Sequence, residues 1–294
     1  MKSRLLFRIT AVFMAAFCLL ALPGCGRQAA EGDAEAEAQK PIIAVTIVPQ
    51  ETFVKAVCGE LYEVVTLVPP GSSPENYEPT PQQMEQFSKA SLYFTIGVPA
   101  ETANFIRNVK DAKIIPLHEE VAAVYPDISF ETGGRDPHIW LSPKRVIVMI
   151  ETIARELSEF DPENKEAYEA NAADYISRLE ELDEEIKSAL EGVTNRKFIA
   201  YHPAFGYLAE DYGLTMYSLE EEGKEATPKH LADMIDLAKR ENIKAIFYQE
   251  EIDASQSRAF AEEIGGKTIQ LSPLAADYIN NLKAMAELMA EVMQ

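Results

Sequence analysis

The sequence predicts an α/β protein of two lobes, each a mostly parallel sheet with flanking helices, joined by one long helix. Two observations support this fold. Short apolar runs alternate with helical patterns in both the early and the late part of the chain. Between these parts, from residue 142 to 190, almost every residue favours helix. Alternating strand and helix signals are typical of parallel sheets covered by helices.

Residues 1–25 have the pattern of a bacterial lipoprotein signal peptide. Three basic residues precede an apolar run over 9–22, which is shorter than the roughly 20 residues of a membrane span. Pro23 and Gly24 then precede Cys25, as in a lipobox. Cleavage would leave Cys25 as a lipid-modified N-terminus, which anchors the protein outside the cytoplasm on the bacterial cell membrane. The alternative is an ordinary signal peptide with an incidental cysteine.

Residues 26–40 are rich in alanine and glutamate and carry no large apolar residue, so we expect a disordered tether. About 250 residues follow, enough for two lobes. The net charge of −21 argues against a nucleic-acid partner. Cys58 is the one cysteine after Cys25, so the mature chain has no pair for an internal disulfide.

The N-terminal α/β lobe is expected over residues 41–158. Its apolar runs predict buried strands, and the stretches between them have helical composition. The predicted strands are 42–48, 64–68, 92–97 and 113–117, and the predicted helices lie near 50–59, 81–89 and 101–110.

A long linking helix is expected over residues 159–192, starting at an Asp-Pro boundary and ending at Gly192. Its apolar residues recur every three or four positions, which places them on one helical face: Tyr168, Ala172, Tyr175, Leu179, Leu182, Ile186 and Leu190. This face could form a coiled-coil dimer seam. Because the pattern is a single stretch of about three heptads inside an α/β chain, we favour a helix that lies along the body of a monomer.

The C-terminal α/β lobe is expected over residues 193–294, where strand and helix signals alternate again. The predicted strands are 197–201, 215–219, 244–249 and 267–271, and the predicted helices lie near 203–212, 228–240, 254–264 and 275–293. In such folds, ligands bind near the carboxyl ends of the strands, here between the two lobes.

Two of the four histidines are candidates for this cleft. His138 lies between two prolines, and Asp136 is close enough to orient it, as metal-bound histidines require. His202 directly follows a predicted strand, so its side chain would project from the carboxyl edge of a sheet. For His118 and His230 we favour structural roles.

Carboxylates follow two further predicted strands. Glu75 lies in a loop over 69–83 that contains five prolines, and Gln249 and Glu251 share a face after another strand. Two imidazoles with carboxylate oxygens suit zinc, manganese or iron. The alternative for Glu75 is an ordinary exposed surface charge.

Three separated motifs carry a resemblance to a known family: PENYEPTPQQM from Pro74, DPHIWLSP from Asp136 and YHPAFGYLAEDYGL from Tyr201. Together they resemble the solute-binding lipoproteins of bacterial ABC importers for zinc and manganese, a group that includes adhesin-type lipoproteins. The resemblance covers about residues 42–294. It implies a non-enzymatic carrier that captures a divalent transition metal, with zinc favoured over manganese. The carrier would deliver that metal to the membrane permease and ATPase subunits of the importer.

The chain departs from the family pattern at two positions. The resemblance places metal ligands at His138 and His202, but Glu75 stands where the family usually has histidine. Ser272 falls where many members have a ligating aspartate, and the His-rich loop of many zinc-uptake members is absent from the sequence. We therefore expect a rearranged metal site of Glu75, His138, His202 and Glu251, with Gln249 or water as alternatives to Glu251.

Two other functions are weighed against this one. A metal-dependent hydrolase is the first, although the sequence contains neither His-Glu-x-x-His nor Gly-x-Ser-x-Gly. The second is a surface adhesion or structural lipoprotein with a degenerate metal site.

Overall fold

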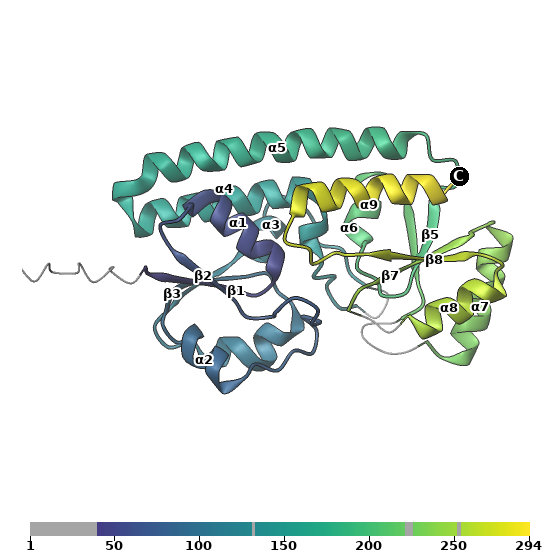
Figure 1. Ribbon diagram of the computed structural model, residues 1–294, viewed down its shortest axis with the longest axis horizontal. Helices are drawn as coiled ribbons and strands as arrows, with labels where there is room; N and C mark the ends of the chain where they lie inside the picture. Colours follow the sequence, from purple (N-terminus) through teal and green to yellow (C-terminus); the bar gives the residue numbers. More distant parts are fainter. Residues whose placement is uncertain (1–39, 131–132, 221–225, 252–253) are drawn as a thin grey trace, which may run out of the picture. The chain divides into compact units, whose positions relative to one another are not determined.

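A computed structural model describes residues 40–130, 133–220, 226–251 and 254–294 (Figure 1). They belong to one compact unit, Lys40–Gln294. The expected signal peptide with Cys25 and the tether up to residue 39 lie outside the described residues. Within the described part, no helix has the length and apolar character needed to cross a membrane.

The first sheet has four parallel strands in the order β2-β1-β3-β4. Its strands are β1 (Ile42–Val45), β2 (Glu63–Thr66), β3 (Ala90–Thr95) and β4 (Lys113–Pro116). The predicted strand over 42–48 ends early because Ile47 caps α1 (Val48–Cys58). The Gln50 side chain accepts hydrogen bonds from the backbone N–H groups of Thr46 and Ile47 at 3.0 and 3.1 Å, so the chain turns directly into the helix.

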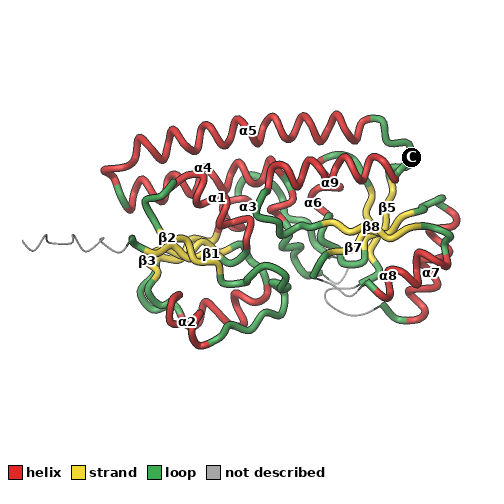
Figure 2. The backbone as a smooth tube through the Cα atoms, in the orientation of Figure 1, coloured by secondary structure: helices red, strands yellow, loops and turns green. Residues whose placement is uncertain are grey.

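The second sheet repeats this arrangement with the order β6-β5-β7-β8, again parallel throughout. Its strands are β5 (Lys197–Ala200), β6 (Thr215–Ser218), β7 (Ala245–Gln249) and β8 (Lys267–Leu271). The two sheets appear as separate groups of yellow strands in Figure 2. We call the first sheet with its helices the first lobe, and the second sheet with its helices the second lobe. The predicted α/β class with two parallel sheets is confirmed.

Helices flank both sheets (Figure 1). Besides α1, the helices of the described part are α2 (Pro81–Phe87), α3 (Leu117–Ala122), α4 (Pro143–Phe160), α5 (Lys165–Glu191), α6 (Gly206–Asp211), α7 (Pro228–Arg240), α8 (Ser255–Glu263) and α9 (Tyr278–Val292). Short 3₁₀ turns occur at Ile106–Asn108, Ile139–Leu141 and Pro162–Asn164.

The long helix α5 confirms the predicted connection between the sheets. Its buried residues are the seven apolar positions picked out by spacing: Tyr168, Ala172, Tyr175, Leu179, Leu182, Ile186 and Leu190. This face packs against α4, α1 and α9 of the same chain, and Figure 1 shows α5 passing over both sheets. A coiled-coil dimer seam is therefore the wrong interpretation, because intramolecular partners already cover the apolar face.

The predicted helix over 101–110 is wrong in type. The chain instead forms a π-helical turn, Glu101–Phe105, closed by a hydrogen bond from the N–H of Ile106 to the carbonyl of Glu101, and the 3₁₀ turn follows. The side chain of Glu101 folds back onto the preceding backbone, where it accepts from Ile96 and Gly97. Single π-helical turns of this kind occur frequently at functional sites.

Candidate metal centre

The structure brings together three of the four predicted metal ligands. Glu75 lies in the loop after β2, His138 precedes the 3₁₀ turn that leads into α4, and His202 follows β5. One ligand atom from each lies within 4.8 Å of the other two. Both histidines are buried, with 3% and 5% of their surfaces exposed, while the Glu75 side chain is 22% exposed.

The spacing of these atoms fits one small metal ion. The Nε2 atoms of His138 and His202 face each other at 3.2 Å, and Oε1 of Glu75 lies 3.0 Å from Nε2 of His202. With bonds of about 2.0–2.1 Å, neighbouring ligands of a tetrahedral zinc ion lie about 3.3 Å apart. Two of the three separations are therefore close to those between ligands of such an ion, and the third, between Glu75 and His138, is within 4.8 Å.

Asp136 orients the ring of His138, as the sequence predicted. Its Oδ1 atom lies 2.7 Å from Nδ1 of His138 and accepts the backbone N–H of the same residue at 2.9 Å. Asp136 is 1% exposed. With Nδ1 held by the carboxylate, Nε2 is available to bind a metal ion, as in the carboxylate–histidine–metal arrangement.

Glu220 orients His202 in the same way, a contact that was not predicted from the sequence. Its Oε2 atom lies 2.9 Å from Nδ1 of His202, although the two residues are 18 positions apart. The backbone N–H of Glu220 donates to the carbonyl of Tyr201 at 2.8 Å, which brings the end of β6 beside the end of β5. The available signal was the position of Glu220 just after a predicted strand, the criterion that had selected Glu75 and His202.

Electrostatics in the metal-free site favour a proton on His202. Burial lowers the pKa of this histidine, but hydrogen bonds to Glu220 and Glu75 outweigh burial and raise the pKa to about 9. Burial raises the pKa of Glu75, yet its hydrogen bond to His202 and the charges of both histidines bring it below the ordinary value. The same carboxylates that hold the proton can hold a divalent cation in its place.

Glu251, the fourth predicted ligand, does not belong to this group of three. It is half-buried after β7, and its Oε2 atom has no hydrogen-bond partner among the described residues. Burial raises the pKa of this carboxyl, and the charge of His202 acts in the opposite direction. Gln249 is buried at the end of β7. Ser272, at the family's aspartate position, donates to Glu250 at 3.5 Å.

The other two histidines lie outside the group. His118 is in α3, and its Nδ1 atom is buried without a partner among residues the structure describes. His230 is in the first turn of α7, with Nε2 at 3.0 Å from the carbonyl oxygen of Ser218.

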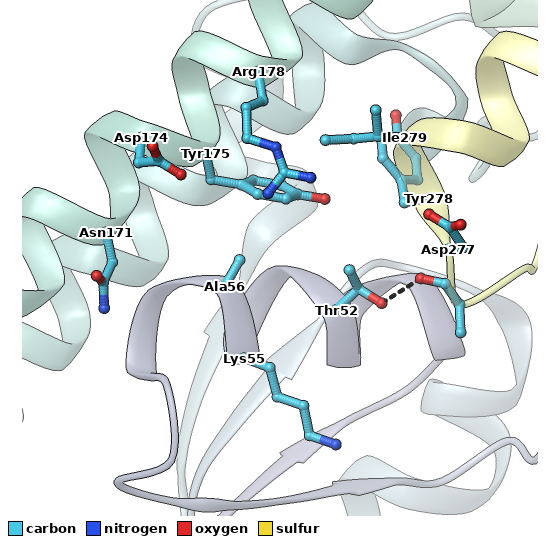
Figure 3. A pocket seen from close by; sticks show the side chains of 11 residues that line it. Thr52, Lys55, Ala56, Asn171, Asp174, Tyr175, Arg178, Asp277, Tyr278 and Ile279 are labelled. Atoms are coloured by element: carbon cyan, nitrogen blue, oxygen red, sulfur yellow. Dashed lines mark hydrogen bonds between the residues drawn. The ribbon is translucent and has the colours of Figure 1, made fainter.

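A cavity of about 450 Å³ lies elsewhere, lined by residues of α1, α5 and the start of α9 (Figure 3). Tyr175 projects into it beside Arg178, and Thr52 donates to the carbonyl of Ala276 across it at 2.7 Å. None of the three clustered ligands lines this cavity. Its walls mark the junction between the first lobe, α5 and the segment after β8.

A known protein family matches almost all of the part of the chain that the structure describes. The family model described as zinc-uptake complex component A, periplasmic, matches residues 43–292. The chain belongs to this family. Membership places it among metal-uptake components rather than in an enzyme family.

Individual relatives agree with this assignment. The high-affinity zinc uptake system protein ZnuA of Bacillus subtilis is 29% identical to this chain. The alignment covers 90% of this chain and 88% of the relative. The zinc-binding lipoprotein AdcA of Streptococcus pneumoniae is 30% identical over 90% of the chain, which spans about half of AdcA (54%). A zinc-bound deletion mutant of ZnuA superposes with a TM-score of 0.81 at 37% identity, covering 87% of this chain and 99% of the other.

Proposed function

We propose that the chain is the extracytoplasmic solute-binding lipoprotein of an ABC importer for zinc. It captures one ion between the two lobes on Glu75, His138 and His202 and passes it to the membrane permease, while the ATPase subunit drives transport. The observation that carries this proposal is the convergence of two carboxylate-oriented imidazoles and one carboxylate within 4.8 Å. Relatives named as zinc-uptake and zinc-binding proteins support it.

The donor set favours zinc over manganese. Two imidazole nitrogens at a tetrahedral spacing match zinc, whereas manganese prefers an octahedral shell of oxygens. Glu75 stands in place of the usual family histidine and adds an oxygen ligand, which makes the preference for zinc over manganese smaller. The preference is not reversed, because most nitrogen and oxygen sites bind zinc more tightly than manganese.

Glu251 closes the site as the fourth ligand in this proposal. A buried carboxylate oxygen without a partner costs stability unless something binds it, and Oε2 of Glu251 has no partner among the described residues. The charge of His202 also acts on this carboxyl group. Glu251→Gln should lower zinc affinity, while Gln249→Ala should lower it less. Equal affinity in wild type and Glu251→Gln would assign the fourth position to water or Gln249.

The lipid anchor at Cys25 and the monomeric state complete the proposal. The leader pattern supports the anchor, as does the name of the AdcA relative as a lipoprotein. The intramolecular packing of the apolar face of α5 supports a monomer.

Calorimetric titration of the purified full chain tests the proposed function. We expect one zinc ion to bind per chain at neutral pH, with zinc displacing manganese in competition. Absence of binding for both metals would reject the carrier proposal and favour the structural lipoprotein. Turnover of an ester by the zinc-loaded chain, lost in His202→Ala, would favour the hydrolase.

A further inference from the structure

Glu101 is a buried carboxyl group that the metal site does not use directly. Only 1% of its surface is exposed. It accepts hydrogen bonds from the backbone N–H groups of Ile96 at 2.8 Å and Gly97 at 2.7 Å, and from the hydroxyl of Thr46. These contacts join the ends of β1 and β3 at the carboxyl edge of the first sheet.

Burying this carboxyl has an energetic cost that ordinary packing would avoid. Burial raises the pKa of Glu101 to about 7 even though three donors and the charge of Arg135 act to lower it. Buried charged groups are rare unless paired, and an apolar residue at such a position is often equally stabilising. A role other than stability would account for an acid here.

The turn that begins at Glu101 holds the loop of Glu75 on both sides. The backbone N–H of Ala100 donates to the carbonyl of Pro74 at 3.2 Å. The side-chain amide of Asn104 donates to the carbonyl of Tyr77 at 2.8 Å. Pro74 and Tyr77 flank Glu75, so the ligand's backbone is fixed by the π-helical turn that Glu101 anchors to the sheet.

The same anchor reaches His138 through Arg135. Nη2 of Arg135 donates to the carbonyl oxygens of Gly97 at 2.9 Å and Ile96 at 3.2 Å, and Nη1 donates to the carbonyl of Asp136 at 3.4 Å. Asp136 in turn holds the ring of His138. Gly97 has a φ of +86°, and a Cβ atom there would lie 2.0 Å from Nη2 of Arg135. Only glycine allows this close approach.

We propose that Glu101 is a positioning residue for the metal site, because it locks the Glu75 loop and the Asp136–His138 segment to one point on the sheet edge. This inference rests on the proposed metal-binding function. In this role Glu101 does not bind the metal itself but keeps the segments that carry the ligands in the geometry that metal binding requires.

Glu101→Gln is the direct test, because the substitution keeps the size of the side chain. It removes the charge and places an amide NH₂ opposite one of the two backbone N–H donors, Ile96 or Gly97. We expect a folded full chain with zinc affinity roughly tenfold lower, at the lower end of the 10–100-fold range for outer-shell partners. The visible d–d bands of bound Co²⁺, which report ligand geometry, should also shift.

Asp161→Asn is the matched control. Asp161 accepts from Tyr168 at 2.7 Å and Asn164 at 2.8 Å at the start of α5, outside the metal-ligand group. This variant loses a hydrogen-bonded carboxylate as Glu101→Gln does. Its zinc affinity and Co²⁺ spectrum should match wild type even if its stability falls.

Repeating Glu101→Gln in a Glu75→Ala background tests the route of the effect. If Glu101 acts through the loop, its effect on zinc affinity should shrink once the loop carries no ligand. Should Glu101→Gln fail to fold, Asn104→Ala removes one arm of the same support, and we expect a fall of roughly fivefold for one lost hydrogen bond.

The outcomes distinguish failure of the positioning role from failure of the metal-binding function. If wild type binds zinc and Glu101→Gln binds it equally well with an unchanged Co²⁺ spectrum, the positioning role is overturned and the carrier stands. An undiminished effect in the Glu75→Ala background overturns the route through the loop and leaves the route through Arg135 to the Asp136–His138 segment. If wild type binds no zinc, the proposed function itself has failed.

Discussion

His138 and His202 receive their orienting carboxylates from different distances along the chain. Asp136 is two residues before His138 and also accepts the backbone N–H of that residue, so this half of the site is built within one short segment. Glu220 is 18 residues after His202 and meets it only because β5 and β6 are neighbours in the sheet. His202 also contacts Glu75 from the first lobe. The first histidine is therefore held locally, and the second is held by the fold.

The largest expected effect is the loss of either histidine. His202→Ala removes a ligand and leaves Glu220 and Glu75 without their shared partner, so the rise in melting temperature on adding zinc should disappear. In wild type, zinc at 100 times its dissociation constant should add about 2.7 kcal/mol to the free energy of unfolding. His138→Ala should behave alike.

His230→Ala is the control for these variants, because His230 lies outside the ligand group. It should keep most of the zinc-induced shift in differential scanning calorimetry. Equal loss in His230→Ala and His202→Ala would remove His202 from the site.

The next effect is on pH dependence. In the metal-free protein the pKa of His202 is raised to about 9 from its ordinary value of 6.5. Stabilisation from its ion pairs is thus fully present below pH 6.5 and is lost as the pH rises through 9. Zinc must displace the proton, so zinc affinity should move the opposite way, rising about tenfold per pH unit up to roughly pH 9.

Calorimetry in buffers of different ionisation enthalpy would measure the release of about one proton per zinc at pH 7.5. An unperturbed histidine would place the change in affinity near pH 6.5 instead. Affinity that is flat between pH 7 and 9 would show that His202 is not protonated in the metal-free protein.

Substituting the orienting carboxylates, Asp136 and Glu220, one at a time tests whether the two histidines are held in different ways. Asp136→Asn and Glu220→Gln should each weaken zinc binding about 10–100-fold. Asp136→Asn should also lower the stability of the metal-free chain, because it disturbs the backbone contact at His138. Glu220→Gln removes a main cause of the raised pKa of His202 and should shift the proton-release window to lower pH. Identical pH profiles in the two variants would contradict this division of roles.

Glu75 should give the smallest change among the three ligands. It is the most exposed of them and lies on a loop, so Glu75→Gln should weaken zinc binding less than either histidine deletion.

Glu75→His restores the imidazole usual in the family. Because imidazole suits zinc and carboxylate suits manganese, the ratio of zinc to manganese affinity should rise. Competition titration of both metals measures this ratio, and an unchanged ratio together with a silent Glu75→Gln would return Glu75 to a surface charge.

The same contrast explains how far the sequence could predict the molecule. Continuous apolar runs placed the eight strands of the described part, because parallel strands are buried on both faces, and the 3.6-residue period placed the buried face of α5. Asp136 was predictable because it is adjacent to its partner. Glu220 could have been a candidate from its position after a predicted strand, but its pairing with His202 depends on the neighbouring positions of β5 and β6 in the sheet. The π-helical turn at Glu101 was missed because it depends on hydrogen bonds from the side chain to Ile96 and Gly97, which local propensity does not encode.

X-ray absorption at the zinc edge of the zinc-loaded chain tests the central claim most directly. We expect one zinc ion with two imidazole nitrogens and carboxylate oxygen in a four-coordinate shell at about 2.0–2.1 Å. We also expect His202→Ala to reduce the imidazole contribution from two to one. A shell of six oxygens, or two imidazoles that persist in His202→Ala, would contradict the assignment of the site to Glu75, His138 and His202.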